Sequence, residues 1–413
     1  MGFRNIILRM DVVHVVSGSS PLEGVDNDAG VSLQRLDVQP ISGLATILRM
    51  PAAQLPELIR TAHANPDVAN MCMQMFYVLM ALGKNDFAIE MQRRALHIRS
   101  VYRIAGTRTP AIRLLALMGP GDMLENTPIE FLLENSDVSL DILYFQPDEP
   151  LPETIPDHDI AIVALGESEK NLPLLQLLDA LSVRWPKPLL NAPRCILRCA
   201  RDSVYALLSD IPALIVPRTE RVAGGSVKPP RFPFTIRPID THAGHGLMKF
   251  DAGGSLEQYF RDFPSQAYYL SEYVDYQSED GCFRKLRIAL IDGVPYLCHL
   301  AISEQWMVHY VSAEMELSAQ KRAEEAMLMS HFGETFGVRH ASALQAIYQR
   351  IGLDYVVMDC AETRSGELLL FEVDSRALVH ATDPVDVFPY KPQVMTKAFN
   401  AFRSMLRNRL NLL

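Results

Sequence analysis

The sequence has 413 residues, of which 48% are hydrophobic and 21% charged, so it is long and apolar enough to bury at least two sizeable cores. Its net charge of -10 does not favour nucleic acid through bulk electrostatics, because phosphate contacts need clustered Lys and Arg. No apolar run approaches the roughly 20 residues of a membrane span, and the six cysteines are scattered singly. We therefore expect a soluble, cytoplasmic protein of roughly two to four domains that binds neither nucleic acid nor membrane.

Helical periodicity dominates residues 51–103. Apolar residues recur at i, i+3 and i+4 over 68–82, Gly83 ends that run, and a second helical pattern covers 87–96. The helix–glycine–helix unit resembles a single tetratricopeptide-type repeat, a class that usually stacks at least three copies. The alternative is a small helical cap on the next domain. We expect this segment to be able to meet a peptide or protein partner.

Strands and helices alternate from about residue 112. Strands are predicted at 113–118, 138–145 and 159–166, and helices at 127–134 and 171–181. Such alternation predicts an open parallel sheet. From about residue 189 the pattern becomes α+β, with strand pairs typical of hairpins. The predicted fold class is thus mixed α/β and α+β, divided into an N-terminal region (1–110), a small parallel α/β domain (111–188) and a larger C-terminal domain (189–413).

Three carboxylates end two apolar strands near the C-terminus. Asp359 ends the first, and Glu372 and Asp374 end the second, where residues two apart point to the same face. Converging carboxylates in apolar surroundings repel one another unless a cation lies among them. Hard oxygen ligands favour Mg2+ or Mn2+, especially one that also contacts phosphates. The alternative is a set of ordinary strand-end acids facing solvent.

A cation and a glycine-bearing loop follow another strand. Arg237 lies at the end of the strand, and the loop Thr241–Leu247 comes shortly after it. Backbone N–H groups of such a loop can surround phosphates, and an arginine can neutralise them. The segment Glu272–Val274 then runs into an acidic linker, so its backbone could pair with an adenine edge while an acid serves the ribose hydroxyls. Further on, Lys285 and Arg287 share one strand face, which suits a bound anion or a salt-bridged surface.

In this order the motifs resemble the ATP-grasp superfamily, notably D-alanine–D-alanine ligase, glutathione synthetase and the ligase that glutamylates a ribosomal protein. The resemblance covers about residues 112–405. It matches Thr235-Ile-Arg-Pro to the phosphate-binding strand, Ala243-Gly-His-Gly to the glycine loop and Ser271-Glu-Tyr-Val to the adenine hinge. The implied metal ligands are Asp359, Glu372 and Asp374. The implied ATP-binding residues are Arg201, Arg237, Ala243, Gly244, His245, Gly246, Glu272, Tyr273, Val274 and Asp280.

The resemblance implies an ATP- and Mg2+-dependent (or Mn2+-dependent) ligase that joins a carboxylate to an amine through an acyl-phosphate. Its substrates would be small molecules or peptides, and a homodimer is common among such relatives. The implied catalytic residues are Arg287, Lys285 and His309. Arg287 would stabilise the transferring phosphoryl group and His309 would donate to an acyl-phosphate oxygen. A packed strand with a satisfied histidine is the alternative for the His309 segment.

Departures from the family pattern keep other functions open. Ser203 stands where relatives carry a lysine that contacts ATP, and either Arg198 or Arg201 would have to compensate. Arg237 stands at a second usual lysine position, and Asp374 stands where asparagine is usual. The alternatives are a small-molecule kinase of the same superfamily and a non-catalytic nucleotide-binding interaction module.

Overall fold

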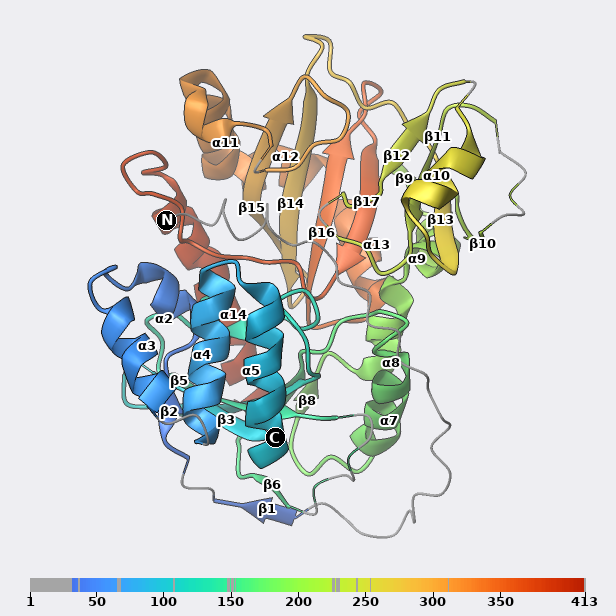
Figure 1. Ribbon diagram of the computed structural model, residues 1–413. Helices are drawn as coiled ribbons and strands as arrows, with labels where there is room; N and C mark the ends of the chain where they lie inside the picture. The colour runs from blue at the N-terminus through green and yellow to red at the C-terminus, as the bar shows by residue number, and fades with distance from the viewer. Residues whose placement is uncertain are drawn as a thin grey trace. The chain divides into compact units, whose positions relative to one another are not determined.

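The computed structural model describes residues 32–411 apart from 36–37, 65–67, 107, 147–148, 150–151, 153, 225–226, 228–230, 243, 253 and 311. Its fold class is mixed α/β with several sheets, as the sequence predicts (Figure 1). The chain separates into two compact units. The first comprises 1–164, 177–190 and 406–413, and the second comprises 165–176 and 191–405. The predicted three-domain division stays a prediction.

The first unit is built on a six-stranded sheet of order β2-β3-β5-β4-β7-β8. β1 and β6 pair separately as a two-stranded parallel sheet. The elements of this unit are β1 (Ser32–Gln34), β2 (Pro40–Ile41), α2 (Leu44–Arg49), α3 (Leu55–Ala64), α4 (Ala69–Ala81), α5 (Asn85–Ile98), β3 (Val101–Ile104), β4 (Ile112–Met118), α6 (Ile129–Leu132), β5 (Val138–Tyr144), β6 (Thr154–Pro156), β7 (Ile160–Val163) and β8 (Leu189–Leu190).

The parallel core of this sheet is confirmed, because β4 pairs in parallel with both β5 and β7, and β7 does so with β8. These strands are buried on both faces, as parallel strands usually are. The difference from the prediction is β3, which pairs antiparallel with β5. β3 comes from residues that precede the region where strands and helices alternate in the sequence. The helical hairpin is also present as α4 and α5, joined at Gly83, whose φ of 66° suits the glycine that ends a helix.

The second unit contains two sheets. One is a four-stranded antiparallel sheet of order β10-β13-β11-β12, and the other has five strands in the order β15-β14-β16-β17-β9. Its elements are α8 (Pro193–Ile196), α9 (Arg201–Leu208), β9 (Leu214–Ile215), β10 (Thr219–Ala223), β11 (Phe234–Pro238), β12 (Met248–Phe250), α10 (Leu256–Asp262), β13 (Ala267–Glu272), β14 (Phe283–Ile291), β15 (Val294–Ser303), α11 (Ala319–His331), α12 (Phe336–Arg339), α13 (Ala341–Ile351), β16 (Tyr355–Glu362) and β17 (Leu368–Asp374). α7 (Leu172–Ser182) and α14 (Lys391–Asn411) each continue from one unit into the other.

Local sequence explains the hairpin of the five-stranded sheet. β14 and β15 are joined by Asp292 and Gly293, with φ values of 49° and 80°. Positive φ at both central residues is the geometry that favours Asp-Gly in a two-residue turn. β16, the next strand, is almost continuously buried, so Asp359 is a carboxylate in an apolar strand with 2% exposure. Such a group needs charged or hydrogen-bonding partners.

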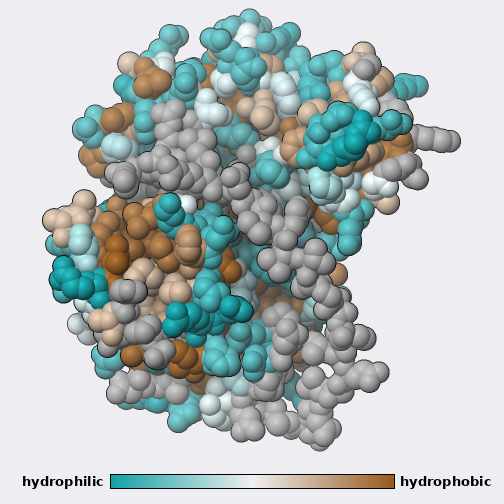
Figure 2. Space-filling view, in the orientation of Figure 1, coloured by the Kyte–Doolittle hydropathy of each residue, from teal (hydrophilic) through white to brown (hydrophobic). Residues whose placement is uncertain are grey.

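The four-stranded sheet has its own small core. Phe234 and Phe250 stack with their ring centroids 5.2 Å apart, and Tyr259 of α10 packs edge-on against Phe250. The other side of α10 carries exposed polar and charged residues, and Figure 2 shows this surface as hydrophilic. α10 is therefore an ordinary amphipathic helix that covers one face of the sheet. Among the described helices, none combines the length and apolar character needed to cross a membrane.

Candidate functional site

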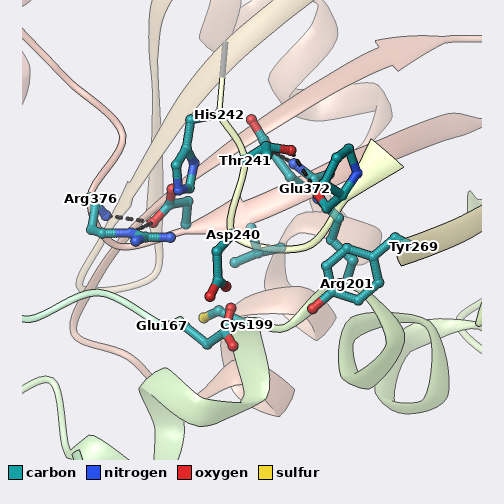
Figure 3. Close-up of a pocket in the computed structure, with 12 residues that line it drawn as sticks. Glu167, Cys199, Arg201, Asp240, Thr241, His242, Tyr269, Glu372 and Arg376 are labelled. Atoms are coloured by element: carbon teal, nitrogen blue, oxygen red, sulfur yellow. Dashed lines mark hydrogen bonds and ion pairs between the residues drawn. The ribbon is translucent and has the colours of Figure 1, made fainter. Parts of the chain in front are cut away.

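A pocket in the second unit is lined by residues from both of its sheets (Figure 3). The loop after β11, the strands β13 and β17, the start of α9 and the segment after β7 all contribute side chains. The lining residues are Glu167, Cys199, Arg201, Pro238, Asp240, Thr241, His242, Tyr269, Glu372, Val373, Asp374 and Arg376.

Asp359 is held by the two cations predicted to share a strand face. Lys285 Nζ lies 2.9 Å from Asp359 Oδ2, and Arg287 donates to both carboxylate oxygens at 2.8 and 3.0 Å. The strand register explains the contact, because Arg287 on β14 lies directly opposite Asp359 on β16. Burial alone would raise the pKa of Asp359, but Arg287 and Lys285 hold it well below its ordinary value. The carboxylate is therefore ionised at neutral pH.

Glu372 lies on β17 opposite Asp359 and pairs with Arg201. Burial opposes ionisation of Glu372, yet Arg201 is the main influence that lowers its pKa. Arg201 also donates to the carbonyl oxygen of Phe371 at 3.1 Å. Arg201, rather than Ser203, is thus the α9 residue that lines the pocket. Arg198 bonds instead to the carbonyl oxygen of Arg350 at 3.1 Å.

Asp374 shares its face of β17 with Glu372 but has a different partner. Its Oδ1 accepts from the backbone N–H of Arg376 at 2.8 Å and from Arg376 Nε at 3.2 Å (Figure 3). Burial works against the charge, whereas Arg376 and His242 lower the pKa of Asp374. His242 itself has a pKa lowered to about 4 by burial and by Arg376, so its imidazole is neutral.

The three predicted metal ligands thus have suitable chemistry but no preassembled arrangement. All three are oxygen donors with lowered pKa values, as a divalent ion prefers. Each is already neutralised by an arginine or lysine. Within the part of the chain that the structure describes, no three His, Cys, Asp or Glu side chains are grouped for metal binding. The donor set fits Mg2+ only if an incoming polyanion takes over the cations.

Arg237 stabilises the start of the glycine-bearing loop. Its Nε donates to Thr241 Oγ1 at 3.2 Å and its Nη2 donates to the Thr241 carbonyl oxygen. The side chain is 8% exposed, and burial and Arg201 lower its pKa to about 9, so it remains charged at neutral pH. The predicted phosphate contact of Arg237 stays a prediction, and its observed partner is the loop backbone.

The glycine loop is fixed at its far end. Tyr259 donates to the carbonyl oxygen of Gly246 at 2.7 Å, and the His245 ring meets Phe263 edge-on at 5.9 Å. Gly244 lies against the imidazole of His309, which comes from the segment after β15. Ala243 lies outside the described residues.

The predicted adenine hinge follows β13. The backbone N–H of Glu272 donates to the Arg218 carbonyl oxygen at 3.0 Å, and that of Tyr273 donates to the Pro233 carbonyl oxygen at 3.2 Å. Val274 comes next, outside any strand. The Tyr273 ring lies 3.9 Å from Lys249 Nζ, which gives this segment a cation above an aromatic face.

Asp280, predicted as one of the ATP-binding residues, lies in the turn before β14. Its carboxylate pairs with Arg284 at 2.7 Å and is half exposed. This ion pair accounts for the charge of Asp280 without a ligand. The predicted contact of Asp280 with ATP stays a prediction.

Sequence reasoning missed the acidic end of the pocket. Glu167 follows β7, and burial raises its pKa to about 7. Figure 3 shows its carboxyl group and that of Asp240 on the same side of the pocket, close to Cys199. Arg376 crosses beside Gly166, where a Cβ would lie 1.6 Å from Arg376 Cδ. The available signal was the Gly-Glu-Ser at the carboxyl end of a predicted parallel strand, where such sheets place ligand-binding groups.

The site therefore has two ends of opposite charge. Around Asp359 and Glu372 lie four cationic side chains for two carboxylates, namely Lys285, Arg287, Arg201 and Arg237. At the other end three acids, Asp374, Glu167 and Asp240, lie around Arg376, and Arg221 also acts on Glu167. A surplus of positive charge in a partly desolvated site favours anions such as phosphates. The acidic end favours a cation or a proton-donating ammonium.

The chain matches no family model and no curated protein. Among solved structures, similarity is found to D-alanine–D-alanine ligase from Bacillus anthracis, at 12% identity and a TM-score of 0.43, covering 73% of this chain and 100% of that one. VanG D-Ala:D-Ser ligase from Enterococcus faecalis matches at 10% identity and a TM-score of 0.44, covering 71% and 99%. An ATP-grasp RimK domain protein from Sphaerobacter thermophilus matches at 14% identity and a TM-score of 0.38, covering 71% and 99%.

Proposed function

We propose that this protein is an ATP-dependent carboxylate–amine ligase that forms an amide bond through an acyl-phosphate. The observation that carries the proposal is the charge polarity of the pocket, with surplus cations at one end and surplus acids at the other. In the proposed reaction the γ-phosphoryl group passes from ATP to the substrate carboxylate and ADP leaves. The amine then attacks the acyl carbon and displaces phosphate.

The cationic end would bind the polyphosphate. Arg201, Lys285 and Arg287 would exchange their carboxylate partners for phosphate oxygens, which offer the same charge-assisted hydrogen bonds. Their positions are set by strand and helix rather than by flexible loops. Preorganised positive charge of this kind stabilises a phosphoryl group as it transfers.

A divalent ion is part of the proposal. Once phosphates have engaged Arg201, Lys285 and Arg287, Asp359 and Glu372 would be free to hold Mg2+ or Mn2+, and Asp374 would join them on leaving Arg376. The ion would supply further charge neutralisation to the phosphates.

The acidic end would receive the amine. Glu167 has a pKa raised to about 7 by burial, so near neutral pH its carboxylate can accept a proton from an ammonium group. An amine must lose that proton before it can attack the acyl carbon. Asp240 lies on the same side of the pocket and would supply further negative charge.

Hydroxylamine gives a direct test. The protein is incubated with ATP, Mg2+ and a panel of amino acids and peptides, and hydroxylamine is added as a small amine that converts acyl-phosphates into hydroxamates. ADP release accompanied by a hydroxamate supports ligation. A phosphorylated product that does not react with hydroxylamine would select the kinase alternative. ATP binding without ADP release across the panel would select the non-catalytic module.

Metal dependence is tested in the same assay. We expect ADP release to stop with excess EDTA and to recover when Mg2+ or Mn2+ is restored. Turnover that persists in EDTA would remove the metal from the proposal while leaving the ligase chemistry to the hydroxamate test.

A further inference from the structure

The imidazole of His309 lies where the glycine-bearing loop passes closest to the five-stranded sheet. A Cβ built on Gly244 would be 2.3 Å from His309 Nε2 and 3.1 Å from its Cε1. In protein structures, Cβ atoms essentially never lie that close to a heavy atom to which they are not bonded. Only a glycine allows the loop backbone and the imidazole to occupy their present positions. Its φ of 76° independently favours glycine as well.

The same imidazole has an unused hydrogen-bonding position. His309 Nε2 is buried, and no donor or acceptor among the described residues lies within hydrogen-bonding reach of it. A buried polar atom left in this state carries an uncompensated desolvation cost. Such an atom in a binding site is expected to find its partner in a ligand.

The surroundings identify the kind of partner. Lys285, Glu372, Asp359 and Arg237 are the charged groups that act on His309, so the imidazole lies beside the cationic end of the pocket. Burial and Lys285 lower its pKa to about 4, which makes it neutral. A neutral imidazole protonated at Nε2 donates one hydrogen bond. The anion suited to this end of the pocket offers acceptor oxygens.

His309 is itself well anchored. Its carbonyl oxygen accepts from the Ala313 N–H at 2.8 Å and from Ser312 Oγ at 3.2 Å. The loop is anchored separately through Arg237 and Tyr259. Two independently held segments therefore meet where Gly244 lies against the imidazole.

We propose that His309 is a positioning residue that seats the glycine loop through Gly244, and that a phosphoryl oxygen of the bound nucleotide completes the hydrogen bond at its Nε2. This inference rests on the proposed function, because it names a contact within the same nucleotide site. It assigns Gly244 a steric role that differs from providing a backbone N–H to phosphate.

The test measures the affinity for Mg-ATP by calorimetry in the full chain. His309→Ala is expected to raise Kd about tenfold, the usual size of a lost hydrogen bond to a charged group. His309→Gln, which keeps a donor at a similar reach, is expected to restore part of that loss. His331→Ala, at an exposed histidine of α11, is the control and should bind ATP as the wild type does.

A double-mutant cycle tests the contact itself. Gly244→Ala should weaken ATP binding by about tenfold or more, but the double variant Gly244→Ala/His309→Ala should bind about as well as His309→Ala alone, because the imidazole that obstructs the new Cβ is gone. Gly366→Ala is the matched control for strain. Its φ is 87°, and nothing lies within 4 Å of the built Cβ. It should leave the ATP affinity unchanged.

The outcomes separate the two proposals. If the wild type binds no ATP, the proposed function fails. If the wild type binds ATP and His309→Ala binds it equally well, the inference about His309 is wrong and the proposed function stands. Additive losses in the double variant would also overturn the inference, because they would show that Gly244 acts independently of His309. Thermal unfolding of each variant confirms that it is folded.

Discussion

Two buried ion clusters in the second unit use similar residues in different ways. The Lys391 cluster comprises Lys391, Glu325, Asp383, Tyr310 and Tyr390. Glu325 is fully buried and accepts from Tyr390 at 2.6 Å, from Tyr310 at 3.1 Å and from the Leu300 N–H at 3.0 Å. Lys391 pairs with Asp383 at 2.8 Å, and its ammonium group also lies 4.1 Å from the centre of the Tyr310 ring. None of these five residues lines the described pocket.

The Asp359 cluster comprises Asp359, Lys285, Arg287, Glu372 and Arg201. It also pairs every carboxylate with a cation, but Glu372 and Arg201 line the pocket, and their side chains are 27% and 22% exposed. The Lys391 cluster is thus complete without a ligand and serves the fold. The Asp359 cluster has one more cation than carboxylates, and two of its members, Glu372 and Arg201, line the pocket. Both clusters are buried and both are unequal in charge, so the feature that indicates binding in the Asp359 cluster is the position of Glu372 and Arg201 at a pocket.

The largest expected effect is a loss of ATP turnover when the Asp359 cluster is substituted. Glu372→Gln removes the carboxylate that orients Arg201 and that would help to hold the metal, so ATP turnover should fall by about 1,000-fold or more. ADP release measures the change. Glu362→Gln is the matched control, because Glu362 ends the neighbouring strand β16 and pairs with Arg339 instead. Turnover of Glu372→Gln within about tenfold of the Glu362→Gln value would contradict the assignment.

In the free energy of unfolding, the Lys391 cluster should be the one that responds to substitution. Lys391→Met leaves the fully buried Glu325 and its neighbour Asp383 without their cation. Breaking a buried pair in this way costs about 3–5 kcal/mol. We expect the free energy of unfolding to fall by that amount while the ATP affinity of the folded protein stays within about threefold. Unchanged stability would show that the Lys391 cluster does not serve the fold.

The two clusters should also respond to pH in opposite directions, although this effect is smaller. Burial raises the pKa of Glu325, so its contribution to stability is complete below about 4.5 and is lost as the pH rises through the folded-state pKa. In the Asp359 cluster Arg201 lowers the pKa of Glu372, so its contribution is present above about 4.5 and is lost on acidification.

Urea unfolding at a series of pH values checks these directions. Relative to the wild type, Glu325→Gln should gain stability as the pH rises from about 4.5, and Glu372→Gln should lose it as the pH rises from below the folded-state pKa of Glu372. If the stability of both variants, relative to the wild type, changed in the same direction with pH, the two clusters would not differ in their response to pH.

Much of the fold could be predicted because its signals are local. The apolar strand at 113–118 appears where the sequence places it, and Asp292-Gly293 forms a two-residue hairpin turn, whereas the strand predicted to end at Asp359 continues as β16 to Glu362. The direction of β3 could not be predicted, because pairing with β5 depends on residues about 40 positions away.

The site was less predictable because its partners are distant in the chain. The sequence suggests that Asp359 and Glu372 converge, and the register of β16 and β17 brings them opposite each other. It does not reveal that Arg201, 171 positions from Glu372, pairs with it. Glu167 was missed for a similar reason: only the folded chain brings it to the pocket that β17 and the loop after β11 also line.

The central claim is that the cationic end of the pocket binds nucleotide phosphates, and calorimetry with Mg-ATP tests it most directly. Arg201→Met should raise Kd about tenfold or more, because it removes a charge-assisted contact to phosphate. Arg198→Met, three residues earlier and bonded to the Arg350 carbonyl oxygen, should bind as the wild type does. Equal affinity in Arg201→Met and Arg198→Met, or no binding in the wild type, would contradict the account.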